Sequence, residues 1–280
     1  MKAARFEYRR AGTLEEAIGW LQEGEGRAKA IAGGQSLGPM LNLRLARPAT
    51  IIDISKVPEL RTVTADGGGI QVGACVTHSE LEDGVFPALR GHPVQRAAGV
   101  IAYRAIRNRG TIGGSLAHAD PAADWPVVLT ALGAEVDLVS PRGRRRLGLA
   151  EFMQGAYTTD LAVDEILATV RLPAYAPDSR WGYYKFCRKT GEFAEASCAA
   201  LLAPSTRTAR IAVGALDGAP RLLPALAEAV AREGLPAAGR DAVAAAVRAL
   251  LPDRDVVDHR QFASAVERCL AQTLGEEALA

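Results

Sequence analysis

The chain has 280 residues, of which 49% are hydrophobic and 23% charged, and its formal net charge is only +1. This length allows a sizeable core and two or three folding units. A nearly neutral chain has no global field that would attract nucleic acid or an anionic membrane surface, so we expect neither partner.

The four cysteines are scattered along the chain without metal-ligand spacing, which predicts reduced thiols and no metal site. The N-terminal residues show no secretory signal, and no apolar run approaches the roughly 18 residues of a membrane helix. We therefore expect a cytoplasmic protein without an integral membrane segment.

Residues 1–57 are predicted to form a compact βαβ-like unit. A capping-box pattern at 13–16 begins a helix that ends near Gly24. A short strand at 29–32 leads into two glycines and a short helix, and a second strand follows at 50–54.

Residues 58–175 are predicted to form a middle unit. Its helical patterns include an apolar stripe over 94–108 and a helix that starts at Asp120 and Pro121 and ends near Gly133. The arginines at 142, 144, 145 and 146 are interpreted as a solvated hairpin tip, and docking of an acidic partner is the alternative. The expected strands are 70–76, 135–140, 144–149 and 165–172.

Residues 176–280 are predicted to form a smaller unit in which strands are followed by helices, an α+β signature. The expected strands are 180–188, 193–202 and 208–215, and the expected helices are 223–232, 241–251 and 261–274.

Two short segments carry a pair of glycines followed by a hydroxyl. Gly33 and Gly34 precede Ser36, and Gly113 and Gly114 precede Ser115. Such a backbone approaches a phosphate closely and offers N–H donors. Two copies predict two phosphates and hence a dinucleotide, although no G-x-G-x-x-G or Walker pattern supports a Rossmann domain or P-loop.

The first segment also fits a nucleophile elbow, because residues 34–38 read G-x-S-x-G between a strand and a helix. A serine hydrolase would use Ser36 with a later histidine, for which only His259 is suitably placed. This alternative leaves the second glycine pair unexplained.

The runs AGGQSL at 32–37, IRNRGTIGGS at 106–115 and DPAAD at 120–124 together resemble the FAD-binding (medium) subunit of molybdenum hydroxylases. The similarity extends over essentially the whole chain and is closest to carbon monoxide dehydrogenase-like enzymes. Xanthine dehydrogenase carries the same domain. The resemblance implies a two-part FAD-binding domain of the PCMH or vanillyl-alcohol-oxidase type at 1–175. A smaller C-terminal α+β domain, a three-stranded sheet with helices, would occupy 176–280.

The resemblance also implies the contacts of a non-covalent FAD, with no catalytic residue and no metal ligand in this chain. Asp124 would contact the adenosine part. The flavin ring would lie near Ile101, Leu167, Lys185 and Phe193. The pyrophosphate would be wrapped by Ala30, Ile31, Ala32, Gly33, Gly34, Gln35, Ser36 and Leu37 and by Thr111, Ile112, Gly113, Gly114 and Ser115, through backbone N–H groups and hydroxyls.

By the same resemblance, the chain is an electron-transfer subunit. It would take electrons from the [2Fe–2S] clusters of a small subunit, while a large subunit carries molybdopterin, and pass them to an external acceptor. A dimer of heterotrimers is the expected assembly. A self-sufficient FAD oxidase or reductase of the same fold is the alternative.

Overall fold

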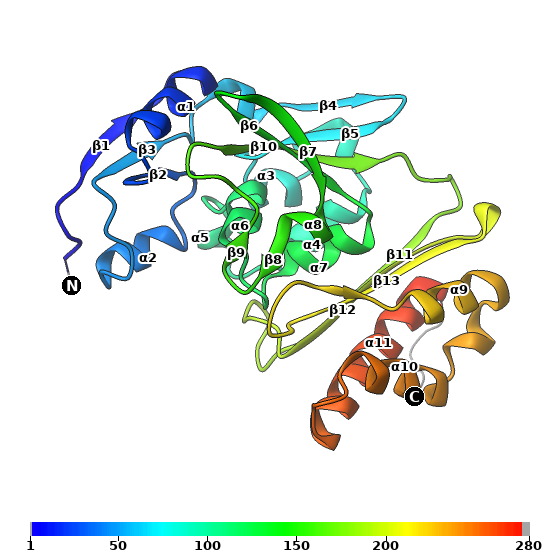
Figure 1. Cartoon of the computed structure of the whole chain (residues 1–280). Helices are drawn as coiled ribbons and strands as arrows, with labels where there is room; N and C mark the ends of the chain where they lie inside the picture. Colours follow the sequence, from blue (N-terminus) through cyan, green and yellow to red (C-terminus); the bar gives the residue numbers. More distant parts are fainter. Residues whose placement is uncertain (1, 276–280) are drawn as a thin grey trace.

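Three main β-sheets follow one another along the chain in the computed structural model, which describes residues 2–275 (Figure 1). The first is parallel, and the second and third are antiparallel. The α+β fold class is confirmed. None of the helices in residues 2–275 is long and apolar enough to span a bilayer.

The N-terminal sheet has the order β1-β3-β2, formed by β1 (Glu7–Arg10), β3 (Thr50–Asp53) and β2 (Ala28–Ile31). The parallel pairing of β2 with β3 confirms the βαβ interpretation, whereas β1 was not predicted. Helix α1 (Leu14–Glu23) buries its apolar face against this sheet, and the short α2 (Leu37–Asn42) follows β2.

The middle sheet has the order β4-β5-β10-β6-β7. Its hairpin at 142–146 is not simply solvated, because Arg142 pairs with Asp164, Arg145 with the buried Glu165 and Arg146 with Asp137. Most of the hairpin's charge is therefore matched by the chain's own carboxylates. The strands are β4 (Val63–Asp66), β5 (Gly69–Gly73), β10 (Ile166–Pro173), β6 (Glu135–Ser140) and β7 (Gly143–Gly148). A separate two-stranded ribbon is formed by β8 (Met153–Gly155) and β9 (Thr158–Thr159).

The helix expected over 94–108 is broken into α4 (Pro93–Gly99) and α5 (Arg104–Arg107). Ala102 has a φ of 43°, and the Arg107 guanidinium takes the carbonyls of Ile101 and Ala102. In a continuous helix, those carbonyls would instead accept hydrogen bonds from the backbone N–H groups of the next turn. The remaining helices of the middle unit are α3 (His78–Glu82), α6 (Ile112–His118), α7 (Asp124–Ala131) and α8 (Leu149–Phe152).

The expected helix start at Asp120 was also wrong, because α7 begins at Asp124. The side chain of Asp120 accepts from the N–H of Ala122, and its carbonyl accepts from Ala123. These bonds close a turn before the helix begins.

The C-terminal sheet has four strands rather than three, because the two-residue β14 (Arg221–Leu222) pairs with β13 (Thr208–Gly214). The other strands are β11 (Arg180–Phe186) and β12 (Ala196–Ala203). Three helices cover one face, namely α9 (Pro224–Glu233), α10 (Arg240–Leu250) and α11 (Val256–Leu274) (Figure 1).

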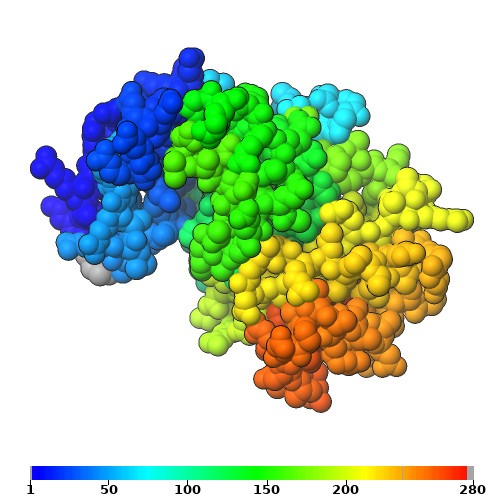
Figure 2. Space-filling view, viewed as in Figure 1, coloured from blue at the N-terminus to red at the C-terminus, as the bar shows by residue number. Residues whose placement is uncertain are grey.

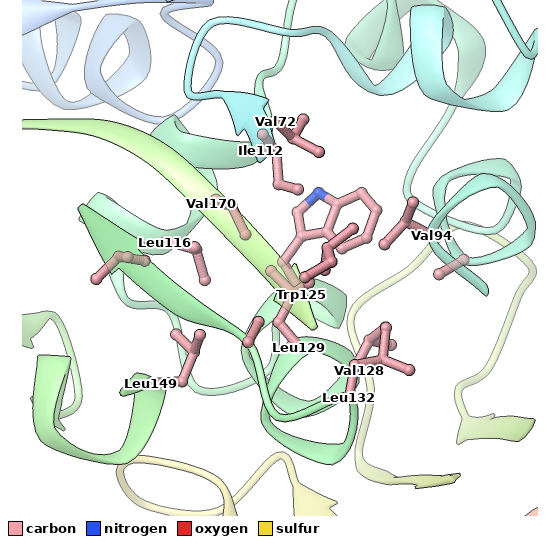
Figure 3. Packing of buried hydrophobic residues seen from close by; sticks show 14 of the residues in the cluster. Val72, Val94, Ile112, Leu116, Trp125, Val128, Leu129, Leu132, Leu149 and Val170 are labelled. Carbon is pink, nitrogen blue, oxygen red and sulfur yellow. The ribbon is translucent and has the colours of Figure 1, made fainter. Parts of the chain in front are cut away.

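Helix α7 lies at the centre of the molecule, and all eight of its residues are buried. Its Trp125 packs among Val72, Ile112 and Val94 of the middle unit (Figure 3). On the other side, Ala199 and Ala212 of the C-terminal sheet belong to the same apolar cluster. The C-terminal sheet therefore shares a core with the middle unit.

Candidate functional site

The two glycine-containing segments, far apart in sequence, lie side by side. A Cβ on Gly33 would lie 1.9 Å from the carbonyl oxygen of Arg109, just before the second segment. The Arg109 Nε donates to the Gly33 carbonyl at 3.3 Å, and a Cβ on Gly114 would lie 4.0 Å from the Ala32 Cβ. Glycine at position 33 is thus required for this close approach.

The first segment presents a row of free donors. Within residues 2–275, the backbone N–H groups of 33–37 have no hydrogen-bond partner. Gly34 has a φ of +70°, which favours glycine, and the hydroxyl of Ser36 makes no cap bond to α2. Consecutive N–H groups of this kind form an anion-binding concavity.

The other residues expected in the first segment flank this row. Ala30 and Ile31 end β2, and Ala32 links the strand to Gly33. The amide of Gln35 donates to the Gly33 carbonyl at 3.1 Å, which braces the turn. Leu37 is the first residue of α2.

The second segment differs from our expectation, because it forms the first turn of α6. The N–H groups of Ile112 and Gly113 donate to the carbonyls of Val76 and Ala74. Those of Gly114 and Ser115 donate to the hydroxyl and carbonyl of Thr111. These four N–H groups are therefore already used within the chain, and the segment offers a ligand the exposed Gly114 and the hydroxyl of Ser115 instead.

Asp124 and Lys185 form one buried ion pair. Lys185 Nζ lies 2.9 Å from Asp124 Oδ1 and donates to the Val100 carbonyl at 3.0 Å. The Tyr183 hydroxyl donates to the same carboxylate oxygen at 2.7 Å. Two side chains this close cannot serve opposite ends of an extended dinucleotide, so the separate adenosine and flavin roles expected for Asp124 and Lys185 do not fit this geometry.

Tyr183 is a site residue that the sequence interpretation missed. Burial, reinforced by the Asp124 charge, raises the pKa of this phenol well above its usual value. It therefore stays a protonated donor at neutral pH. Its position two residues before Lys185, on the same face of β11, was the signal that could have identified it.

Three further expected flavin contacts lie in different environments. The half-buried Ile101 adjoins the carbonyl that Lys185 binds. Phe193 is 66% exposed in the loop between β11 and β12, and Gly191 of that loop closely approaches the Ala102 carbonyl. The structure thus brings Ile101, Lys185 and Phe193 into one region. The side chain of Leu167, by contrast, is buried in the middle core.

The hydrolase alternative finds no support in this geometry. Ser36 has ordinary right-handed helical angles, and among the described residues no histidine hydrogen-bonds to it. His78 accepts from Trp125, and His259 bonds the carbonyl of Leu251.

Residues 4–175 match the family described as the FAD binding domain in molybdopterin dehydrogenase. The chain belongs to this family. It is 39% identical over 204 residues to the carbon monoxide dehydrogenase medium chain of Hydrogenophaga pseudoflava, covering 73% of this chain and 71% of that one. It is 41% identical to the nicotine 6-hydroxylase medium subunit of Paenarthrobacter nicotinovorans, covering 78% and 77% respectively.

Solved structures of the FAD-binding subunit family extend the similarity to the whole fold. A carbon monoxide dehydrogenase structure from Hydrogenophaga pseudoflava superposes with a TM-score of 0.87 at 32% identity, covering 99% of this chain and 100% of that one. The quinoline 2-oxidoreductase of Pseudomonas putida 86 gives 0.87 at 30% identity, covering 98% and 99%. The chain is an oxidoreductase subunit with FAD as its cofactor, and the free donors of the first segment fit a pyrophosphate.

Proposed function

We propose that this chain is the FAD-carrying electron-transfer subunit of a heteromeric molybdenum hydroxylase. The observation that carries the proposal is the row of free N–H groups at 33–37 beside the exposed Gly114 in the first turn of α6. FAD supplies the redox chemistry, and the protein supplies binding, orientation and electrostatics.

FAD binding is divided between two groups of residues, one at each end of the site. The first segment and the hydroxyls of Ser36 and Ser115 hold the pyrophosphate. The pair of Asp124 and Lys185, with Ile101 and Phe193 nearby, lies at the flavin end. The Lys185 ammonium, held there by Asp124 and the Val100 carbonyl, would be a fixed hydrogen-bond donor at the flavin end when FAD is bound.

The partners follow from what this sequence lacks. Two [2Fe–2S] clusters need eight ligands, commonly cysteine thiolates, and the sequence contains four cysteines in all. We therefore assign the clusters to a small subunit. By the family resemblance, we further propose that a large subunit carries molybdopterin and that the complex is a dimer of heterotrimers in the cytoplasm. The relatives' names, medium chain and medium subunit, support such an assembly.

The test is the visible absorption spectrum of the purified chain and chromatography of the nucleotide released on denaturation. We expect a flavin spectrum and free FAD. Ser36→Ala and Gly114→Asp should lower FAD occupancy, the second through charge repulsion with the pyrophosphate and through a Cβ that would lie 2.8 Å from the Thr111 hydroxyl.

Gly19→Asp on α1 is the matched control, because a Cβ there meets nothing within 4 Å. A folded chain that cannot be loaded with FAD would refute the proposal. Turnover of a small substrate by the isolated chain would favour the self-sufficient oxidase instead.

A further inference from the structure

Arg109 has an exposed side chain to which the proposed function gives no role. Within residues 2–275 it forms no ion pair, although arginines elsewhere in the chain are extensively paired. Its side chain makes one hydrogen bond among these residues, from Nε to the Gly33 carbonyl at 3.3 Å. No other cationic side chain in that range hydrogen-bonds to residues 30–37 or 111–115. An arginine without a counter-charge is therefore directed at the first glycine-containing segment.

The backbone at Arg109 is fixed in the middle unit. Its N–H donates to the carbonyl of Ile106 in α5 at 3.1 Å, and the next residue, Gly110, accepts from the N–H of the buried His78 at 2.9 Å. Gly33, by contrast, follows β2 of the N-terminal unit. In Figure 2 this unit is the blue lobe at the left, set apart from the green middle unit by a notch. The bond from Arg109 to Gly33 therefore ties the first segment to a fixed point of the other unit.

The oxygen that Arg109 binds sets the direction of a free donor. In a trans peptide, the carbonyl oxygen of one residue and the N–H of the next point to opposite sides, and no peptide bond in residues 2–275 is cis. A donor on the Gly33 oxygen therefore holds the Gly34 N–H on the side away from the guanidinium. That N–H belongs to the row of free donors at 33–37.

Gln35 donates to the same carbonyl at 3.1 Å, but its bond has a different effect. Gln35 belongs to the segment that it braces, so its bond fixes the shape of the turn and moves with it. The Arg109 bond comes from 76 residues away in sequence. It fixes where the turn lies relative to Gly114 and Ser115, which follow Arg109 in the chain.

From these observations we propose that Arg109 is a positioning residue for the cofactor, which acts through the Gly33 carbonyl to hold the Gly34 N–H towards the pyrophosphate. The inference rests on the proposed function, because it requires the pyrophosphate to lie at 33–37. It adds a residue outside both glycine-containing segments, and it gives that guanidinium the task of orienting the protein's own backbone.

The test measures the FAD affinity of the full chain, after removal of its flavin, for Arg109→Met and Arg109→Gln. Methionine keeps an unbranched stem without a donor, whereas the amide nitrogen of glutamine lies as many bonds from Cα as the arginine Nε and can donate to the same carbonyl. Arg109→Met should weaken FAD binding at least fivefold, and Arg109→Gln should recover most of that loss. The melting temperature of either flavin-free variant should lie within about 2 °C of that of the parent chain.

Arg144→Met on β7 is the matched control. Arg144 is also exposed and has no ion pair among the described residues. The substitution removes the same charge and should leave FAD affinity unchanged.

Equal FAD affinity in Arg109→Met and the control would overturn the inference. It would also be overturned if Arg109→Gln bound FAD no better than Arg109→Met, because the charge rather than the hydrogen bond would then matter. A clearly lowered melting temperature of flavin-free Arg109→Met would overturn it too, because a general loss of structure would then explain the weak binding. Failure of the parent chain to take up FAD would instead refute the proposed function itself.

Discussion

Lys185 and Asp124 join two parts of the molecule through one contact of 2.9 Å, with 8% and 7% of their side-chain surfaces exposed. Lys185 comes from the first strand of the C-terminal sheet, and Asp124 is the first residue of the central helix α7. The pair therefore links the C-terminal sheet to α7, beside the apolar core that the two share.

Removing one partner of this pair leaves a buried charge without compensation. We expect Lys185→Met to lower the free energy of unfolding by about 3–5 kcal/mol. Asp124→Asn/Lys185→Met should recover much of that loss, because neither charge is then buried alone. Urea denaturation of four proteins, the parent chain, Lys185→Met, Asp124→Asn and the double variant, measures the coupling, and additive effects of the single changes would contradict the prediction.

Stability should fall below neutral pH because of His78. Burial, with a smaller contribution from the Arg107 charge, lowers the pKa of His78 to about 3, and the indole N–H of Trp125 donates to its Nδ1. In the unfolded chain this group binds a proton below about pH 6.5. The unfolded state is therefore favoured as pH falls from 6.5 towards 3, by up to about 1.4 kcal/mol per pH unit.

His78→Gln keeps an acceptor for Trp125 and removes this titration. The free energy of unfolding of the variant should depend less steeply on pH between 6.5 and 4 than that of the parent chain. Identical slopes would show that His78 does not titrate as described.

The approach of the two glycine segments can be tested at Gly33. An added methyl would lie 1.9 Å from the Arg109 oxygen, so Gly33→Ala should separate the segments, weaken FAD binding more than tenfold and lower the melting temperature. Gly19→Ala in α1 meets nothing within 4 Å and should raise stability by about 0.5–1 kcal/mol. FAD titration and thermal unfolding of both variants measure the difference, and normal FAD binding by Gly33→Ala would contradict the loop geometry.

Two adjacent arginines of the hairpin at 142–146 differ in whether they form an ion pair. Arg145 contacts the buried Glu165 through two hydrogen bonds, and Arg144 has no ion pair among the described residues. Arg145→Gln should lower the free energy of unfolding by about 1–3 kcal/mol, because it leaves a buried carboxylate unpaired. Arg144→Gln should change it by less than about 0.5 kcal/mol. Denaturation of both checks this, and equal effects would mean that the ion pair contributes nothing.

Short-range sequence patterns predicted most of the helices and strands correctly, because in those segments the local preferences of the residues agree with the final structure. Residues 77–80 have the sequence pattern of a capping box, and the box forms, with Thr77 and Glu80 each satisfying the other's backbone N–H. In the pattern at Thr13 only half of the box forms, because Glu16 turns to the N–H of Gly12. The identity of the FAD-binding family also came from contiguous motifs, which a single sequence displays fully.

Long-range contacts account for the features that the sequence did not reveal. The helix breaks after α4, where the Arg107 guanidinium binds the carbonyls of Ile101 and Ala102. The helical pattern of the sequence does not show which carbonyls this side chain will bind. The second segment reads like the first, yet the N–H groups of Ile112 and Gly113 donate to the carbonyls of Val76 and Ala74, which are far away in sequence. The pairing of Asp124 with Lys185 likewise spans the boundary between the middle and C-terminal units.

The turn at 121–122 accepts hydrogen bonds from two segments of the C-terminal unit. The N–H of Ala194 donates to the carbonyl of Ala122, and the N–H of Ala215 donates to the carbonyl of Pro121. A truncation after residue 175 would retain the whole segment that matches the family. It would nevertheless remove both of these hydrogen bonds from the turn. It would also remove the Lys185 partner of the Asp124 carboxylate and expose the side of Val127 that contacts Gly214. The segment that matches the family and the segment that shares one packed core are thus different lengths of this chain.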